Sequence, residues 1–227
     1  MRYENIMEGR FISRPNRFIA EVEICGSVQR CHVKNTGRCR ELLIPGAQVL
    51  LEKSTNPNRK TGYSLISVYK GGRLVNIDSQ APNRAVEEWI KNGGLGENVA
   101  ALKAEVYYKS SRFDFCAKMG RETRFIEVKG VTLEEDGTAL FPDAPTERGV
   151  KHLRELMDCV ENGLEAQVIF VIQMAGVYCF RPNARTHLEF AQALKEAAMA
   201  GVQVCAYSCS VDRDSMVIDR PVPVILQ

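Results

Sequence analysis

The sequence contains no long apolar run. None of its 227 residues belongs to a stretch that approaches the roughly 20 apolar residues needed to span a bilayer, which argues against a helical membrane protein. Residues 1–12 mix charged and apolar side chains without a continuous apolar segment, so we expect no secretory leader. The chain is therefore expected to be cytoplasmic, with no membrane partner.

Cysteine pairs with metal-ligand spacing are also missing. None of the eight cysteines stands in a Cys-x-x-Cys pair, and only three histidines are available as partners. Cys179 and Cys205 lie among apolar residues, where a free thiol behaves as a small hydrophobe. We therefore predict reduced thiols rather than disulfides or a zinc centre.

Aromatic residues are scarce, and the charge is unevenly distributed. Aromatic side chains make up 7% of the chain, which leaves few rings for stacking on bases and argues against sequence-specific readout. Residues 1–80 hold 13 basic and 7 acidic side chains, whereas the remainder holds 17 basic and 21 acidic ones. A basic first part suits a polyanion and an acidic remainder suits a metal site, but ordinary variation between domains produces the same imbalance.

The pattern of elements predicts two domains, 1–80 and 81–227. The first part reads as short strands separated by turn residues, which is typical of a small barrel, with strands over 17–24, 29–33, 47–52 and 63–69. The second part reads as a helix over 84–92 capped by Asn83, then a hairpin over 105–115 and a strand over 124–128. Helices and strands then alternate: helices follow Thr146 and Thr186, and strands span 167–172 and 202–207. This order predicts an α/β domain with a mixed sheet.

Three residues in the middle of the chain carry the chemistry. Glu127 and Lys129 are two positions apart on a predicted strand, so their side chains share one face. Asp114 lies between two phenylalanines on the preceding predicted strand. Two carboxylates can hold Mg²⁺ or Mn²⁺, and a neighbouring lysine can position water and offset charge during phosphodiester cleavage. On spacing alone, an exposed Glu-Lys pair and an unrelated aspartate remain the favoured interpretation.

The sequence resembles the sugar fermentation stimulation protein A family. The resemblance covers nearly the whole chain, and its most specific segment is Phe141-Pro142-Asp143-Ala144-Pro145-Thr146-Glu147-Arg148-Gly149. Shorter matches are Asn35-Thr36-Gly37-Arg38, Pro82-Asn83-Arg84, Ser111-Arg112 with Asp114-Phe115, Glu127-Val128-Lys129 and Phe180-Arg181-Pro182.

The resemblance implies an N-terminal OB-like barrel and a C-terminal domain of the PD-(D/E)XK nuclease type. In that motif Asp114, Glu127 and Lys129 take the catalytic positions, Asp114 and Glu127 hold the metal, and Glu105 is an additional acidic candidate. Phe113 stands where the pattern often has proline. The resemblance also implies non-specific DNA binding and a role in regulating the use of sugars of the maltose type.

Basic side chains near turns and a helix start are candidate DNA contacts. Exposed backbone amides at a helix N-terminus favour phosphate binding. The basic residues that follow Thr146 are therefore candidate DNA contacts, as are those of the barrel loops. The candidate DNA-binding residues are Lys34, Asn35, Arg38, Arg40, Arg59, Lys60, Arg148 and Lys151. For His152, a DNA contact and a structural role are equally favoured. Gln173 ends an apolar strand, and we expect it at the exposed strand end.

Three functions remain in competition. The leading hypothesis is a non-specific DNA-binding protein with an Mg²⁺- or Mn²⁺-dependent nuclease site. The alternative is a catalytically silent DNA-binding transcriptional regulator built on the same fold, whose binding needs salt-sensitive contacts but no metal. An enzyme that acts directly on sugars is the weakest reading, because no sugar-kinase loop is present.

Overall fold

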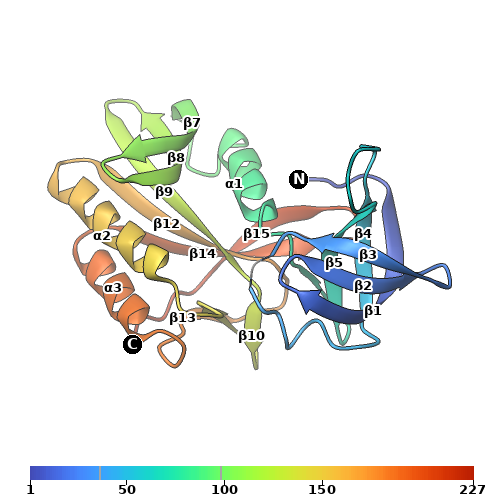
Figure 1. The fold of residues 1–227 in the computed structure, drawn as a ribbon. Helices are drawn as coiled ribbons and strands as arrows, with labels where there is room; N and C mark the ends of the chain where they lie inside the picture. Colours follow the sequence, from blue (N-terminus) through green and yellow to red (C-terminus); the bar gives the residue numbers. More distant parts are fainter. Residues whose placement is uncertain (36, 98) are drawn as a thin grey trace.

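The first part of the chain folds into a small β-barrel (Figure 1). The structure is a computed structural model that describes residues 1–35, 37–97 and 99–227. Strand β5 pairs with β4 and also, in parallel, with β3, which closes the sheet β3-β2-β1-β4-β5 on itself. The strands are β1 (Ile6–Asn16), β2 (Ile19–Ile24), β3 (Ser27–Val33), β4 (Gln48–Lys53) and β5 (Tyr63–Lys70), with β6 (Arg73–Asn76) added beside β5.

The barrel confirms the predicted strands and adds β1. Along β2, Ala20, Val22 and Ile24 are buried and alternate with more exposed residues, as expected for a half-buried strand. In β1 only Phe11 is buried, and the pairing with β2 shifts register twice. Because β1 lacks the alternating pattern of a half-buried strand, its first residues could not be predicted as a strand.

A six-stranded mixed sheet forms the centre of the second domain. Its order is β15-β14-β12-β9-β8-β7, in which β9, β12 and β14 are parallel. These strands are β7 (Val99–Tyr108), β8 (Ser111–Met119), β9 (Glu122–Val131), β12 (Glu165–Ile172), β14 (Gln203–Val211) and β15 (Met216–Val222). A small sheet of β10 (Leu133–Glu135), β11 (Thr138–Phe141) and β13 (Cys179–Pro182) lies beside it.

Helices cover both faces of the central sheet (Figure 1). Val168 and Phe170 of β12 share a core with α2 (Glu147–Glu161) and α3 (Leu188–Met199). Ile169 and Val171 share the other core with α1 (Ala81–Lys91). A strand buried on both faces explains its unbroken apolar run. No helix in the described part of the chain is long and apolar enough to cross a membrane.

The helix starts confirm one predicted cap and correct two. Thr146 caps α2, since its side chain accepts a hydrogen bond from the Gly149 amide. Asn83 is not a cap, because α1 begins two residues earlier with Pro82 in its first turn. Thr186 is not a cap either, because α3 begins after His187. Proline needs no amide partner at a helix start, so it allows α1 to begin before Asn83.

All eight cysteines are free thiols, as predicted from their spacing. Burial raises the pKa of Cys31, Cys39, Cys159 and Cys209 to about 12, so these four thiols stay protonated at neutral pH. They fill apolar space and offer no reactive thiolate.

Buried polar groups join the barrel to the second domain. The Gln173 side chain donates to the backbone oxygens of Asn76 and Asp78 and to the Asn76 side chain, at 2.9–3.1 Å. Gln173 is 1% exposed, so its expected place at an open strand end is wrong. The barrel lies over this end of β12, and its backbone carbonyls supply the partners that water supplies at an open strand end.

A second set of contacts at this junction is ionic. Lys70 and Arg73 of the barrel contact the Glu134 carboxylate of β10 at 2.9 and 3.2 Å. Lys34 contacts the fully buried Asp78 carboxylate at 2.9 Å. Together with the Gln173 contacts, the two pairs with Glu134 fix the barrel against the domain that carries Asp114, Glu127 and Lys129.

Candidate metal and nucleic-acid site

The candidate site forms where β8 separates from β9. Backbone pairing between the two strands ends at Phe115 and Ile126, although both strands continue. Asp114 is the next residue of β8, and its Oδ2 accepts a hydrogen bond from the Val128 amide at 2.8 Å. A carboxylate therefore takes the place that a backbone carbonyl would occupy in a continuous ladder. This arrangement holds Asp114 beside Glu127.

The amide of Asn83 fixes the other oxygen of Asp114. Asn83 lies in the first turn of α1, and its Nδ2 donates to Asp114 Oδ1 at 2.7 Å. The residue that was predicted to cap the helix thus orients a site carboxylate instead. Two donors, one from β9 and one from α1, set the position of this side chain.

Glu127 and Lys129 project from β9 toward α2. The Lys129 ammonium lies 2.6 Å from Glu127 Oε1, which confirms that the two side chains share a face. His152 of α2 lies 2.5 Å from the same oxygen through Nδ1. Glu127, Lys129 and His152 are 5%, 16% and 4% exposed in their side chains, so the pairs are largely shielded from water.

The tautomer of His152 follows from its second contact. Arg148, one turn earlier on α2, donates its Nε–H to His152 Nε2 at 3.3 Å. Because Nε2 accepts a hydrogen bond, the ring proton lies on Nδ1 and is donated to Glu127. Glu127 Oε1 is therefore bonded by both His152 and Lys129.

The surroundings shift the pKa values of the two carboxylates in opposite directions. Burial, reinforced by the nearby Glu127 charge, raises the pKa of Asp114 above its ordinary value. Burial alone would raise the pKa of Glu127 as well, but the hydrogen bond from His152 and the charge of Lys129 outweigh it and lower that pKa. Glu127 is thus held ionised, whereas the Asp114 charge is destabilised until a cation approaches.

One carboxylate oxygen of the site is buried without a partner. Among the described residues, nothing bonds to Glu127 Oε2, although the atom is shielded from solvent. Buried acceptors in native proteins are normally satisfied. An unsatisfied carboxylate oxygen next to a second, destabilised carboxylate matches the hard oxygen ligands that Mg²⁺ and Mn²⁺ require. Asp114 and Glu127 therefore fit a divalent cation.

Glu105 lies next to Asp114 in the strand register but turns away. Its neighbours in β7, Ala104 and Val106, pair with Phe115 and Phe113. Its own backbone has a φ of 56°, and its 68% exposed carboxylate lies 3.5 Å from Arg112. In this conformation the side chain contacts Arg112 rather than the Asp114–Glu127 pair.

The predicted basic residues of α2 lie at its exposed start. Arg148 is exposed and contacts His152, so it connects the surface to the carboxylate cluster. Lys151 is 51% exposed and donates to the Ser110 carbonyl at 3.2 Å. The start of α2 therefore carries Arg148, which contacts His152 at the site, and Lys151, which contacts the turn before β8.

The predicted basic residues of the barrel differ in their contacts and exposure. Lys34 is engaged by the buried Asp78, and the Asn35 side chain accepts from the Gly37 amide at 2.7 Å. Arg38 and Arg40 are exposed on the same segment. Thr36, which belongs to the matching motif, lies outside the described residues.

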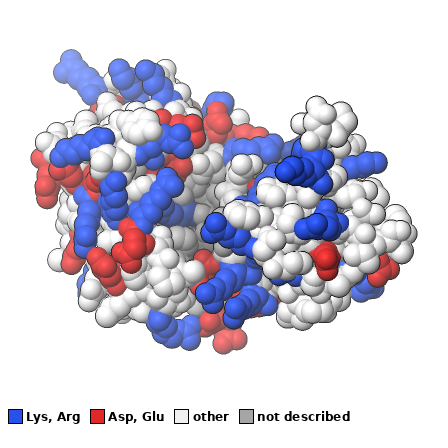
Figure 2. Space-filling model, in the orientation of Figure 1, with Lys and Arg blue, Asp and Glu red and all other residues white. Residues whose placement is uncertain are grey.

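A second basic loop lies between β4 and β5. The Arg59 guanidinium donates to the Ser64 hydroxyl at 3.0 Å, and Lys60 is exposed. Burial, followed by the charges of Arg59 and Lys34, lowers the pKa of His32. Figure 2 shows Lys and Arg side chains gathered along the junction between the domains and over the barrel.

Two residues named in the sequence analysis, His152 and Asn83, organise the site in roles that were not predicted for them. His152 follows Gly149 by three positions and precedes Leu156 by four, and all three are buried on one face of α2. That spacing was a usable signal for a histidine turned toward the sheet. Asn83 gave no comparable signal, because an asparagine near a helix start is most often a cap.

Comparisons with known proteins agree with both domains. Residues 12–77 match the family model described as the SfsA N-terminal OB domain, and residues 80–215 match the sugar fermentation stimulation protein RE domain. A sugar fermentation stimulation protein homolog of Clostridium beijerinckii is 58% identical over 100% of both chains. A homolog of Ruminiclostridium cellulolyticum is 55% identical, again over 100% of both chains.

A solved structure shares the complete fold. It is SfsA of Pyrococcus furiosus in complex with Ca²⁺, which aligns with a TM-score of 0.91 and 28% identity over 99% of this chain and 98% of that chain. An OB barrel followed by an α/β domain with mixed sheets is thus common to both proteins. Given these matches along its whole length, the chain belongs to the sugar fermentation stimulation protein family.

Proposed function

We propose that this protein binds DNA without sequence specificity and cleaves its phosphodiester backbone at the Asp114–Glu127–Lys129 site with Mg²⁺ or Mn²⁺. The observation that carries the proposal is the buried, unpartnered Glu127 Oε2 beside the Asp114 carboxylate. Two carboxylates, one with a free oxygen, together with an adjacent ammonium supply the groups that this reaction needs. A divalent cation bound there would polarise the phosphate and lower the pKa of a bound water.

Each protein group has a separate task in this proposal. Asp114, fixed by Asn83 and Val128, and Glu127 through Oε2 would hold the cation. Lys129 would offset charge that develops on the phosphate. His152 keeps Glu127 Oε1 occupied, which would leave Oε2 as the oxygen that binds the cation. The buried setting strengthens all these interactions by excluding water.

The Ca²⁺ complex of the Pyrococcus furiosus relative supports a cation in this family. Calcium and magnesium both prefer oxygen ligands, although calcium tolerates longer and more variable bonds. On the basis of family membership we also propose a link to the regulation of sugar use of the maltose type. The alternative is a DNA-binding regulator that does not cleave DNA, and the cleavage assay described next distinguishes the two.

A cleavage assay tests the proposal. Supercoiled, linear and single-stranded DNA would be incubated with Mg²⁺ or Mn²⁺, with EDTA as the metal-free control. We expect cutting by the wild type, a loss of about a hundredfold or more in Lys129→Ala because it removes a charge at the reacting phosphate, and retained DNA binding. Lys118→Ala, an exposed lysine on the neighbouring β8, should cut normally.

Two outcomes would contradict nuclease chemistry at this site. Cutting that survives in Lys129→Ala would place the reaction elsewhere. DNA binding without cutting under either metal would favour the silent regulator.

A further inference from the structure

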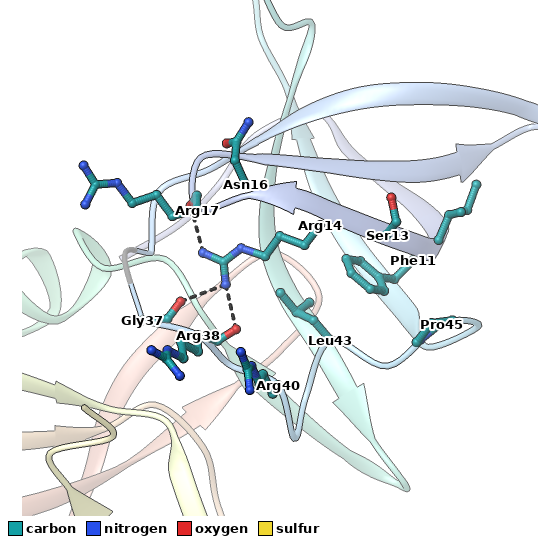
Figure 3. Close-up of a pocket in the computed structure, with 11 residues that line it drawn as sticks. Phe11, Ser13, Arg14, Asn16, Arg17, Gly37, Arg38, Arg40, Leu43 and Pro45 are labelled. Carbon is teal, nitrogen blue, oxygen red and sulfur yellow. Dashed lines mark hydrogen bonds between the residues drawn. The ribbon is translucent and has the colours of Figure 1, made fainter. Parts of the chain in front are cut away.

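A groove on the barrel remains outside the site described so far (Figure 3). It has a volume of about 510 Å³ and lies between the turn that joins β1 to β2 and the segment 37–45 that precedes β4. This volume is within the roughly 300–1,000 Å³ that is typical of sites for small ligands. The groove is open to solvent along the barrel surface.

Arg14 builds the wall of this groove rather than serving as a free cation. Its guanidinium donates to the carbonyls of Gly37, Arg38 and Arg17 (Figure 3), and also to that of Asn35, at 2.7–2.8 Å. Four carbonyl acceptors use most of its donors, so Arg14 ties Asn35, Gly37 and Arg38 against the β1–β2 turn. The groove is therefore preformed.

Three other arginines border the groove with free charge. Arg17, Arg38 and Arg40 are exposed, and in the described part of the chain none of them forms an ion pair. Figure 3 shows Arg38 and Arg40 on one side of Arg14 and Arg17 on the other. Most arginines of the second domain, in contrast, contact carboxylates.

Part of the groove lining is apolar. It includes the buried Phe11 and Leu43 and the exposed Ile12 and Pro45. Phe18, which is 45% exposed, lies outside the lining but beside Arg17, whose guanidinium lies 4.6 Å from the centre of the ring. The groove thus combines unpaired cations with apolar surface, and an exposed aromatic ring lies next to it.

We propose that this groove binds a single-stranded segment of DNA, which names the substrate class of the proposed function and rests on it. Exposed bases of a single strand can lie on the apolar part of the lining and stack on the neighbouring Phe18 ring while their phosphates contact the arginines. A double helix offers its phosphates outward and keeps its bases stacked and paired, so it would use the cations but leave the apolar surface uncovered. The groove matches the single strand more fully.

The groove adjoins a second cavity. Gly37 lines both this groove and a smaller cavity of about 150 Å³ between the domains, which Gly130 and Gln173 also line. A Cβ on Gly37 would clash with the Asp143 carboxylate, so this position requires glycine.

Fluorescence anisotropy with labelled oligonucleotides tests the inference. An oligothymidylate of about twenty nucleotides would be compared with a duplex of equal length and with an oligouridylate. We expect tighter binding of the single-stranded DNA, and a loss of about tenfold or more in the combined variant Arg17→Ala, Arg38→Ala and Arg40→Ala. The salt slope for the single strand should fall by about 0.7 for each phosphate contact that is removed.

Two further variants separate stacking from charge. Phe18→Ala should weaken single-strand binding by about tenfold with an unchanged salt slope, because it removes a stacking surface and no charge. Arg30→Ala removes an exposed charge from β3, outside the groove, and should bind normally.

The outcomes distinguish this inference from the proposed function. Duplex binding that equals or exceeds single-strand binding, or groove variants that bind as the wild type does, would overturn the inference and leave DNA binding intact. Tighter binding of oligouridylate would overturn the assignment to DNA. Absence of binding to every oligonucleotide at low salt would overturn the proposed function itself.

Discussion

Asp114→Asn is expected to lower metal-dependent DNA cleavage by roughly a thousandfold while leaving the protein folded. Asparagine has nearly the shape of aspartate but carries no charge, so it removes an anionic cation ligand and leaves packing unchanged. The loss of one hard oxygen ligand and its charge costs several kcal/mol of transition-state stabilisation, and about 4 kcal/mol corresponds to that factor.

The stability of Asp114→Asn should stay within about 1 kcal/mol of the wild type. Burial and the Glu127 charge raise the pKa of Asp114, so the folded state disfavours its ionised form, and asparagine removes that penalty. Asparagine also offers one acceptor oxygen in place of two, and one of the donors from Asn83 and Val128 loses its partner. That loss costs about 1 kcal/mol and offsets the gain.

The sign of the pH dependence follows from the raised pKa. Folding takes up protons at Asp114, so the wild type loses stability relative to the variant as pH rises from the ordinary pKa of aspartate through the raised one. Thermal unfolding at several pH values measures this difference. Asp219→Asn, an exposed aspartate on β15, is the matched control and should cut and unfold as the wild type does. Undiminished cutting by Asp114→Asn would remove Asp114 from the site.

Gln173→Ala is expected to lower the free energy of unfolding by about 3 kcal/mol. The side-chain amide satisfies three buried acceptors of the barrel, on Asn76 and Asp78, and Gln173 is 1% exposed. Without the amide these acceptors lose a partner that water cannot easily replace, at roughly 1–3 kcal/mol for each group left unsatisfied. Asn76 Oδ1 keeps a bond from the Asp78 amide, which limits the total.

Thermal unfolding measures the effect of Gln173→Ala. For a chain of this size 1 kcal/mol shifts the unfolding midpoint by about 2–4 °C, so we expect a decrease near 8 °C. Gln203→Ala, an exposed glutamine at the start of β14, should shift it by less than about 2 °C. Equal midpoints for the two variants would show that the amide network does not hold the domains together.

Local patterns in the sequence predicted the barrel, the α/β sheet and the shared face of Glu127 and Lys129, whereas the assignment of Asp114, Glu127 and Lys129 to one site came from the family resemblance. Glu127 and Lys129 share a face because alternate residues of a strand do so, and the structure confirms their contact. The apolar run at residues 167–172 forms part of β12, which is buried on both faces at the centre of the sheet, as an unbroken apolar run predicts. These features depend only on near neighbours in the chain.

The remaining features depend on contacts between distant segments. The separation of β8 from β9, which lets Asp114 accept from Val128, is a property of strand pairing that no local pattern encodes. The roles of Asn83 and Gln173 were predicted wrongly because their partners are distant in the chain. Asp114 is 31 residues from Asn83. Asn76 and Asp78 are 97 and 95 residues from Gln173. A polar residue at an element's end looks the same in sequence whether it meets solvent or another domain.

The proposed cleavage depends above all on the binding of a divalent cation by Asp114 and Glu127 together. A second set of candidate cation ligands consists of Glu147, His187 and Glu189, whose ligand atoms lie within 4.8 Å of one another. There, however, His187 Nδ1 accepts from the Thr146 amide at 3.3 Å, which places the ring proton on Nε2, the atom that faces Glu147. A protonated nitrogen cannot ligate a metal, so this group is a poorer site.

Crystals soaked with Mn²⁺ and measured at the manganese absorption edge would test cation binding by Asp114 and Glu127 most directly. We predict an anomalous peak between the carboxylates of Asp114 and Glu127, with Glu127 Oε2 as a ligand, and its disappearance in Asp114→Asn. A peak only among Glu147, His187 and Glu189, or no peak at the Asp114–Glu127 pair at saturating Mn²⁺, would contradict the account.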